Sequence, residues 1–298
     1  MYPAPFHYHR AGSVQEAVSL MSEYGDGARA LAGGQTLLVL MKLRFDEPSD
    51  VIDLGSIPDM CYIDHDDDEV RIGALATHAA IAESPLGEMI PIIKDCANGI
   101  ADVQVRNRGT IGGSLASGDP SCDWPALLHT LDAELLCEGP DGQRILPIQG
   151  FVEDLYQTAL APNEILTEVR FKRPPTNSSG AYAGFKRCAP AYPTATAGVQ
   201  ITLTDNNLCQ DVRIALGSAG LTPIHATDAE RVLRGKALNA ETIDQATEAA
   251  VNAAEPVEDM RGSERFKRSV LAVLVKRAID AATRRCRGEK VEMSHEYY

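Results

Sequence analysis

The chain has 298 residues, 44% of them hydrophobic and 23% charged, which is typical of a globular protein large enough for two or three domains. Its formal net charge of −14 argues against nucleic acid or an anionic membrane surface as a partner, because binding phosphate groups requires a basic surface. The first ten residues show no signal-peptide pattern and no apolar run is long enough to cross a membrane, so we expect a cytoplasmic protein.

Residues 1–54 are expected to form a small α/β unit. Ser13 can cap a helix whose apolar residues recur with helical spacing, and Glu16 three residues later completes a capping-box pattern. A buried strand should lead directly into the pair Gly33-Gly34. The strands expected in this unit cover residues 6–8, 28–31 and 51–54.

Residues 55–175 are expected to form a second α/β segment. The alternation over 69–74 predicts a strand, and Thr77 can cap a short helix after it. Asp141-Gly142 is a hairpin signal between two short strands. The remaining helices are expected around 91–96 and over 125–131, and the remaining strands over 134–137, 144–148 and 164–171.

The stretch KRPPTNSSG, residues 172–180, is the best linker candidate because it is rich in Pro, Ser and Gly. We expect a separate C-terminal domain over residues 176–290, with three antiparallel strands followed by a helical bundle. Its strands should cover 181–188, 197–204 and 211–217, and its helices the regions around 225–234, 240–253 and 263–285.

The cysteines and histidines show no metal-binding pattern. An odd, unclustered set of cysteines without any CxxC pair indicates reduced thiols and gives no ligand set for zinc or an iron–sulfur cluster. The histidines form no HxxxH or HxxEH spacing, so we expect no metal in this chain. The seven cysteines are Cys61, Cys96, Cys122, Cys137, Cys188, Cys209 and Cys286.

Two glycine pairs are the strongest candidates for a binding site. Gly33-Gly34 and Gly112-Gly113 each follow strand-like sequence and precede a small hydroxyl residue and an apolar segment. A glycine pair costs backbone entropy and buries no side chain, so its repetition suggests backbone that passes close to a ligand. Side-chain-free amides can form a concave nest for diphosphate oxygens. Two tight turns would explain either loop alone, but the pair favours an extended dinucleotide bound from two sides.

Asp119 and Asp123 follow the second glycine pair and flank a proline turn. A carboxylate beside phosphates would be repelled, so these side chains should accept hydrogen bonds from a ribose hydroxyl or a ring N–H instead. Capping of the helix expected at 125–131 is an equally good explanation for each of them taken separately. The GxGxxG, GxxxxGK[ST] and GxSxG motifs are absent, so Rossmann, P-loop and hydrolase interpretations have no motif to rest on.

The segments AGGQTLLVLMKLR (32–44) and VQVRNRGTIGGSLASGDPSCDWPALL (103–128) resemble the two flavin-binding signatures of the FAD-carrying medium subunits of molybdenum hydroxylases. This is the family of aerobic carbon monoxide dehydrogenase and, more distantly, xanthine dehydrogenase. FHYHRAGSVQEAVSL (6–20) resembles the family's opening and DMRGSERFKRSVLAVLVKRAI (259–279) its closing helix, so the resemblance covers nearly the whole chain. The extra cysteine-rich insertion of benzoyl-CoA reductase-type members is absent.

The resemblance implies an α+β fold: a two-part FAD-binding domain of the PCMH type (1–54 and 55–175), then a C-terminal domain with a three-stranded antiparallel sheet and a helical bundle. It implies FAD as the cofactor. Asp123 matches an aspartate that contacts the flavin region, Leu166 an apolar residue on the isoalloxazine, Lys186 a basic residue near the ring and Tyr192 a tyrosine beside the flavin. Taken as residues alone, Leu166 is also simple core, and Lys186 and Tyr192 are also surface or strand-packing residues. The residues that the resemblance places around the diphosphate are Ala32, Gly33, Gly34, Gln35 and Thr36 on one side and Thr110, Ile111, Gly112, Gly113 and Ser114 on the other.

The function implied by the resemblance is electron transfer within a larger enzyme. Electrons would leave a substrate at a molybdopterin cofactor on a large subunit and cross [2Fe-2S] clusters on a small subunit. They would then reach FAD on this chain and pass to an external acceptor, in an assembly expected to be a dimer of heterotrimers. Two alternatives stay open at this point: a self-sufficient flavoenzyme of the same FAD-binding class, and a non-catalytic scaffold that keeps the fold.

Overall fold

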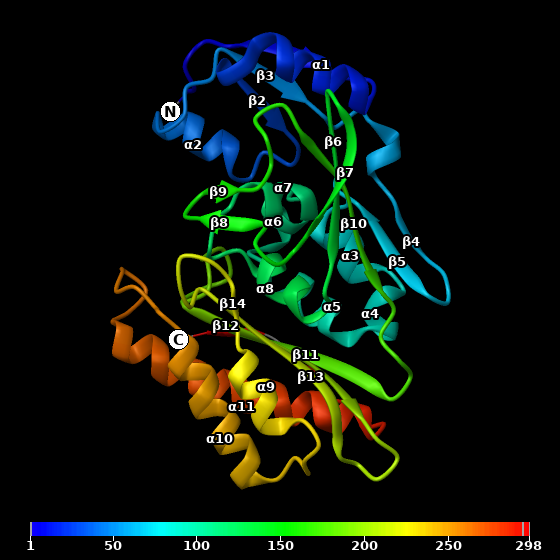
Figure 1. Cartoon of the computed structure of the whole chain (residues 1–298). Coiled ribbons are helices and arrows are strands. Elements are labelled where there is room, and N and C mark those ends of the chain that lie inside the picture. Colours follow the sequence, from blue (N-terminus) through cyan, green and yellow to red (C-terminus); the bar gives the residue numbers. More distant parts are fainter. Residues whose placement is uncertain (1, 294, 298) are drawn as a thin grey trace.

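The computed structural model describes residues 2–293 and 295–297. Three main sheets follow one another along the molecule, from the N-terminal part at the top of Figure 1 to the C-terminal strands and helices at the bottom. Helices lie beside and between these sheets (Figure 1). This arrangement confirms the predicted fold class, a two-part α+β region followed by a C-terminal sheet with a helical bundle.

The first sheet is parallel, with the strand order β1-β3-β2. Ser13 caps α1 as predicted, since its hydroxyl accepts from the Glu16 N–H at 3.1 Å, while the Glu16 carboxylate accepts from Gly12 N–H. The prediction that residues 28–31 form a buried strand is wrong in one respect: this strand lies at the sheet edge, and only Ala28 in it is buried. The elements are β1 (His7–Arg10), α1 (Val14–Tyr24), β2 (Ala28–Leu31), α2 (Leu37–Leu43) and β3 (Asp50–Asp53).

The second sheet is antiparallel, with the order β4-β5-β10-β6-β7 and β10 at its centre. The predicted hairpin joins β6 to β7, and Gly142 turns it with a φ of 107°. Its strands are β4 (Ile63–His65), β5 (Glu69–Gly73), β6 (Glu134–Gly139), β7 (Gly142–Pro147) and β10 (Ile165–Lys172), with a separate pair β8 (Val152–Asp154) and β9 (Gln157–Thr158). Its helices are α3 (His78–Glu83), α4 (Leu86–Met89), α5 (Pro91–Gly99), α6 (Val103–Arg106), α7 (Ile111–Ala116) and α8 (Asp123–Thr130).

The C-terminal sheet has three long antiparallel strands, as predicted, and two short edge strands that sequence patterns did not indicate. The linker prediction is wrong at its end, because β11 already begins at Ser178. Gly180 packs tightly there, since a Cβ on it would lie 2.1 Å from the Gln200 side-chain oxygen. The elements are β11 (Ser178–Lys186), β12 (Ala195–Leu203), β13 (Cys209–Gly217), β14 (Ile224–His225), α9 (Thr227–Leu233), α10 (Ala240–Ala253), α11 (Glu264–Cys286) and β15 (Glu296–Tyr297).

Helices α5 and α8 connect the first two α/β parts to the C-terminal sheet. Helix α5 packs on β11 and α8 on β12 and β13, while α11 crosses β11 and β12 on the side away from them (Figure 1). Trp124 in α8 is fully buried, and Tyr182 of β11 belongs to the same core. The start of α8, where Asp123 lies, is therefore held rigidly at the junction between the two parts.

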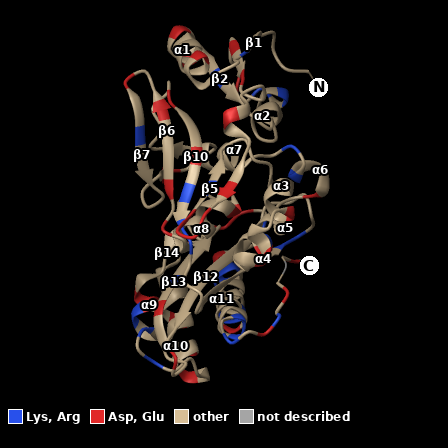
Figure 2. Cartoon of the chain, turned by 90° about the vertical axis from the view of Figure 1, so that its right-hand side faces the viewer, with Lys and Arg blue, Asp and Glu red and all other residues tan. Residues whose placement is uncertain are grey.

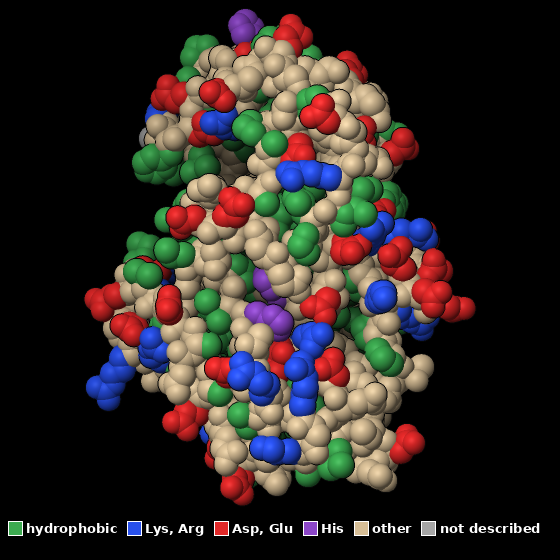
Figure 3. Space-filling view, in the orientation of Figure 1, with side chains coloured by type: hydrophobic (Ala, Val, Ile, Leu, Met, Phe, Trp, Pro, Cys, Tyr) green, Lys and Arg blue, Asp and Glu red, His purple; other side chains and the backbone are tan. Residues whose placement is uncertain are grey.

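Charged residues are distributed over all parts of the chain rather than gathered in one place (Figure 2). Acidic and basic side chains alternate over the face shown in Figure 3, and that face is hollowed between its uppermost part and the part below it. None of the described helices has the length and apolar character needed to cross a membrane.

Candidate functional site: a cavity between the two glycine loops

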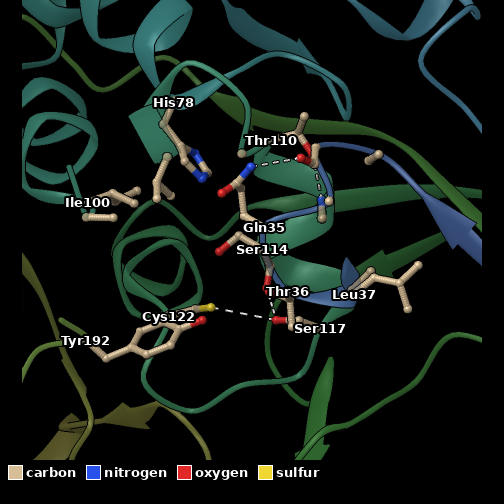
Figure 4. Close-up of a pocket in the computed structure, with 18 of the residues that line it drawn as sticks. Gln35, Thr36, Leu37, His78, Ile100, Thr110, Ser114, Ser117, Cys122 and Tyr192 are labelled. Atoms are coloured by element: carbon tan, nitrogen blue, oxygen red, sulfur yellow. Dashed lines mark hydrogen bonds between the residues drawn. The ribbon is translucent and has the colours of Figure 1, made fainter. Parts of the chain in front are cut away.

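A cavity of about 490 Å³ lies between the N-terminal sheet, the second α/β part and the start of the C-terminal domain. Its size is within the roughly 300–1,000 Å³ that small-molecule and cofactor sites occupy. Figure 4 shows Gln35 and Thr36 from the first glycine loop, His78 from α3, Thr110 and Ser114 from the second loop, and Tyr192 around one space. The structure thus brings the two predicted loops to a single site, together with residues far away in the sequence.

The first glycine loop faces the cavity with its backbone. Gly34 has a φ of 72°, a conformation that favours glycine, and residues 32–36 all line the cavity. In the described part of the chain, the N–H groups of Gly33, Gly34, Gln35 and Thr36 donate to no other protein group. Backbone N–H groups are obligatory donors, so an anionic ligand in this cavity finds a preformed set of them.

Gly33 is required by the approach of one loop to the other. A Cβ on Gly33 would lie 2.0 Å from the carbonyl oxygen of Arg108 and 2.9 Å from the Cα of Gly109. These two residues directly precede the second glycine motif. A side chain at position 33 would therefore clash within the protein itself.

The second glycine loop uses most of its amides internally. Ile111 and Gly112 donate to the carbonyls of Ala76 and Ala74, and Gly113 donates to the Thr110 hydroxyl, which caps α7. Thr110, Gly113 and Ser114 line the cavity, with the Ser114 hydroxyl among the donors that a ligand can reach.

Ile111 and Gly112 are not among the described residues that line the cavity. Ile111 is fully buried in the core. A Cβ on Gly112 would lie 2.5 Å from the Cβ of Ala74. Close packing of α7 against the segment after β5 therefore explains Gly112.

Charged side chains are among the residues that line the cavity. Arg29 is a lining cation, and its Nε already donates to Asp46 at 2.9 Å. Asp123 is 5% exposed and also lines the cavity. Because the one cation seen among the described lining residues is paired, a diphosphate here would be held by N–H and hydroxyl donors.

Asp123 is the first residue of α8, and its carboxylate does not cap the helix. Its Oδ1 lies 2.9 Å from Nε2 of His295, and the neighbouring Asp119 instead accepts from the Ser121 N–H in a local turn. Of the two explanations considered for Asp123, the structure thus favours a carboxylate available to a ligand over a capping residue.

Sequence patterns missed His78, which lines the cavity. The indole of buried Trp124 donates to His78 Nδ1 at 2.9 Å, so the proton of the neutral ring is on Nε2. Burial lowers the pKa of His78 from 6.5 to about 4, which keeps the ring neutral. Nε2–H is therefore a donor close to the cavity wall. A lone histidine that follows a helix cap gives no signal for this role in the sequence.

Leu166 and Lys186 lie outside the set of described lining residues. Leu166 is buried in β10 within the core of the second sheet. Lys186 is 1% exposed, and its amino group donates to the carbonyls of Gly99 and Ala189, next to the lining residues Ile100 and Pro190. Its charge thus lies behind the cavity wall rather than in it, and burial lowers its pKa.

Acidification is expected to destabilise the protein through its buried histidines. Burial lowers the pKa of His78 and of His129 in α8 from 6.5 to about 4. As the pH falls below about 6.5 the unfolded chain takes up these protons first, so the stability present above pH 6.5 is lost progressively towards pH 4. Each group can contribute up to about 3 kcal/mol.

Urea unfolding at pH 7 and pH 5, for the wild type and His129→Gln, measures this loss. The variant should lose less unfolding free energy over the interval than the wild type, while His65→Gln at the exposed end of β4 should match the wild type. If all three proteins lost the same unfolding free energy between pH 7 and pH 5, protonation of buried His129 would not be a cause of the loss.

Fold and cavity together define an α+β protein built to hold an extended dinucleotide between two glycine loops. Comparison with known proteins agrees with this class. Residues 4–174 match the family described as FAD binding domain in molybdopterin dehydrogenase, and residues 180–282 match the CO dehydrogenase flavoprotein C-terminal domain.

Individual relatives extend over almost the full length of the chain. The carbon monoxide dehydrogenase medium chain of Hydrogenophaga pseudoflava is 38% identical over 96% of this chain and 100% of its own. The 6-hydroxypseudooxynicotine dehydrogenase complex subunit alpha of Paenarthrobacter nicotinovorans is 33% identical over 99% of this chain and 100% of its own. A solved structure of carbon monoxide dehydrogenase from H. pseudoflava superimposes with a TM-score of 0.93, at 39% identity over 96% of this chain and 100% of that one.

The chain belongs to the family of FAD-binding medium subunits of molybdopterin dehydrogenases. FAD is the cofactor of this family, and its members are components of multi-subunit oxidoreductases. The family resemblance stated from the sequence is thereby confirmed.

Proposed function

We propose that this chain carries FAD as the electron-transfer subunit of a heterotrimeric molybdenum hydroxylase or dehydrogenase. In this proposal a large subunit holds the molybdopterin cofactor and a small subunit holds [2Fe-2S] clusters. When bound here, FAD supplies the chemistry of accepting these electrons and releasing them to an external acceptor. The observation that supports the proposal most directly is the row of unpaired backbone N–H groups at residues 33–36 in a cavity of cofactor size.

The residues of the cavity divide into three functional groups. The N–H groups of the first loop, from Ala32 to Thr36, together with Thr110, Gly113 and Ser114, would bind the diphosphate. Asp123, His78 and Tyr192 would surround the isoalloxazine ring at the domain junction. Arg29 and Asp46 would face the adenosine end. Four further residues would support the cavity wall from behind by packing, and one of them, Lys186, also by its charge. They are Ile111, Gly112, Leu166 and Lys186.

Subunit partners and domain limits complete the proposal. Names such as medium chain and complex subunit alpha among the relatives support partner subunits, and we propose a dimer of heterotrimers that works in the cytoplasm. The seven free cysteines are consistent with that compartment. The separate sheets support FAD-binding units at 1–54 and 55–175 and a C-terminal domain at 176–290.

The substrate is a property of the partner subunits in this proposal. Two relatives of comparable identity are named for carbon monoxide and for a nicotine derivative, and both cover this chain almost completely. A medium subunit of one fold thus occurs with different oxidised substrates.

Flavin content tests the proposal. The purified chain should be yellow and contain equimolar FAD, quantified by absorbance after acid release, and FAD should rebind to the stripped protein in preference to FMN. Co-purification from the native host should recover two further subunits that contain molybdenum and iron. A colourless chain that does not take up FAD would favour the scaffold alternative. Turnover of an organic substrate by the isolated chain would favour the self-sufficient flavoenzyme.

A further inference from the structure

The C-terminal tail folds back to the domain junction instead of ending beside α11. Arg285 near the end of α11 donates to the carbonyl of Val291 at 2.6 and 2.9 Å. Further along, β15 pairs in parallel with β11, placing Glu296 opposite Phe185 and Tyr297 opposite Lys186. In Figure 2 the C-terminal end accordingly lies beside α5, well above α10.

His295 enters a slot that two glycines create. Its side chain is 1% exposed, although it belongs to a terminal segment. A Cβ on Gly99, at the end of α5, would lie 1.7 Å from Nδ1 of His295, and a Cβ on Gly184 in β11 would lie 2.2 Å from Cδ2. The ring also lies 5.8 Å from the ring of Tyr182. The imidazole is therefore inserted at a place where two residues, Gly99 and Gly184, have no side chain.

The slot directs His295 at a residue of the cofactor cavity. Nε2 of His295 lies 2.9 Å from Oδ1 of Asp123, and Nδ1 is buried with no hydrogen-bond partner among the described residues. A proton on Nδ1 would be an unsatisfied buried donor, so the neutral ring carries its proton on Nε2 and donates it to Asp123. The Asp123 side chain lines the cavity, and besides His295 the hydroxyl of Tyr182 lies near it, donating to the Asp123 backbone carbonyl at 3.1 Å.

We propose that His295 is a positioning residue of the flavin site. Its hydrogen bond fixes one oxygen of Asp123 and so presents the other to an N–H of the bound isoalloxazine ring. This inference rests on the proposed FAD function. It makes the C-terminal tail part of the cofactor site, so that the tail influences both the affinity for FAD and its reduction potential.

Three substitutions separate the hydrogen bond from packing. His295→Phe fills the slot with a ring that cannot donate. His295→Gln places an amide N–H near the position of Nε2, and His295→Asn places it near Nδ1, away from Asp123. Glu296→Gln is the matched control, because it changes an exposed ion pair with Arg277 in the same tail and leaves the slot intact.

Apoprotein titrated with FAD should show about tenfold weaker binding in His295→Phe and His295→Asn, with most of the affinity restored in His295→Gln and none lost in Glu296→Gln. The midpoint potential should fall in the same two variants, because a carboxylate without its donor disfavours the anionic reduced flavin. For the two-electron couple, each tenfold excess weakening of reduced-flavin binding corresponds to about 30 mV.

A purely structural role predicts a different pattern. The apoprotein melting temperature would then drop in the variants while FAD affinity and potential remained those of the wild type, and this result would overturn the proposal. If His295→Phe does not fold, His295→Gln is compared with His295→Asn. Equal FAD affinity and equal midpoint potential in these two variants would also overturn the proposal. Failure of the wild type to bind FAD would instead refute the proposed function itself.

Discussion

Replacing Gly33 by alanine is expected to abolish FAD retention and to destabilise the apoprotein by about 3 kcal/mol. The added Cβ would lie 2.0 Å from the carbonyl oxygen of Arg108, a distance that no side-chain rotation can relieve, because the neighbour is backbone. The two glycine loops must separate to admit the methyl group. Their separation displaces the free N–H groups of the first loop from the cavity.

The apoprotein measurement distinguishes two explanations of the same phenotype. If a side chain at position 33 merely occupied the ligand's space, flavin would be lost but the stripped protein would melt as the wild type does. Contact between the loops predicts that both properties are lost together. Gly12→Ala is a suitable control, because its Cβ would meet only the Glu16 carboxylate at 3.4 Å. Urea unfolding of the stripped proteins and flavin content of the purified ones are the measurements.

Most of the fold could be predicted because its long elements have clear periodic patterns. The apolar spacing of α11 corresponds to its buried face, and the long apolar strand β12 is buried at almost every position between α8 and α11. Strands β4, β8, β9, β14 and β15 have only two or three residues, too few for a pattern to develop. The start of β11 was misplaced because Ser and Gly are frequent in linkers, whereas here they are small residues required by a crowded sheet.

Site residues could be predicted from the sequence only where their role depends on the local backbone conformation. Gly34 has positive φ and Thr110 caps α7, and both roles are local. His78 and His295 reach the cavity region through tertiary contacts with Trp124 and Asp123, across 46 and 172 residues. Gly112 has the same sequence context as Gly33, but a Cβ on Gly112 would meet Ala74, whereas a Cβ on Gly33 would meet Arg108 in the other loop. The neighbour of a glycine's Cα hydrogens is determined by tertiary packing, which the local sequence does not show.

The domain junction depends on a second long-range pair, Asp95 in α5 and Arg285 in α11. Their side chains are 6% and 7% exposed, and Arg285 donates to both carboxylate oxygens at 2.6 and 2.9 Å. Arg285 also donates to the carbonyls of Gly180 and Val291, so it links α5, β11 and the C-terminal tail. Removing one partner of a buried pair leaves the other charge uncompensated.

Arg285→Ala is therefore expected to lower the free energy of unfolding by about 3–5 kcal/mol at pH 7. Burial raises the pKa of Asp95, and Arg285 beside it opposes that rise, so the variant should have a still higher pKa at this carboxyl. A folded-state pKa above the unfolded value means that protonation favours the fold. The difference in unfolding free energy between the wild type and Arg285→Ala should consequently become smaller as the pH is lowered from 7 to 5.

A double variant separates the charge from the lost contacts. Arg285→Ala combined with Asp95→Asn removes the uncompensated carboxylate but retains a side-chain acceptor for the Tyr182 N–H, so it should be more stable than Arg285→Ala alone. Equal stability of the two would mean that the bonds to Gly180 and Val291, not the buried charge, account for the loss. Lys276→Ala on the same helix breaks only an exposed pair with Asp244 and should change stability by no more than about 0.5 kcal/mol. Because Arg285 also anchors the tail at Val291, both variants should bind FAD more weakly than the wild type if the tail supports the cofactor site.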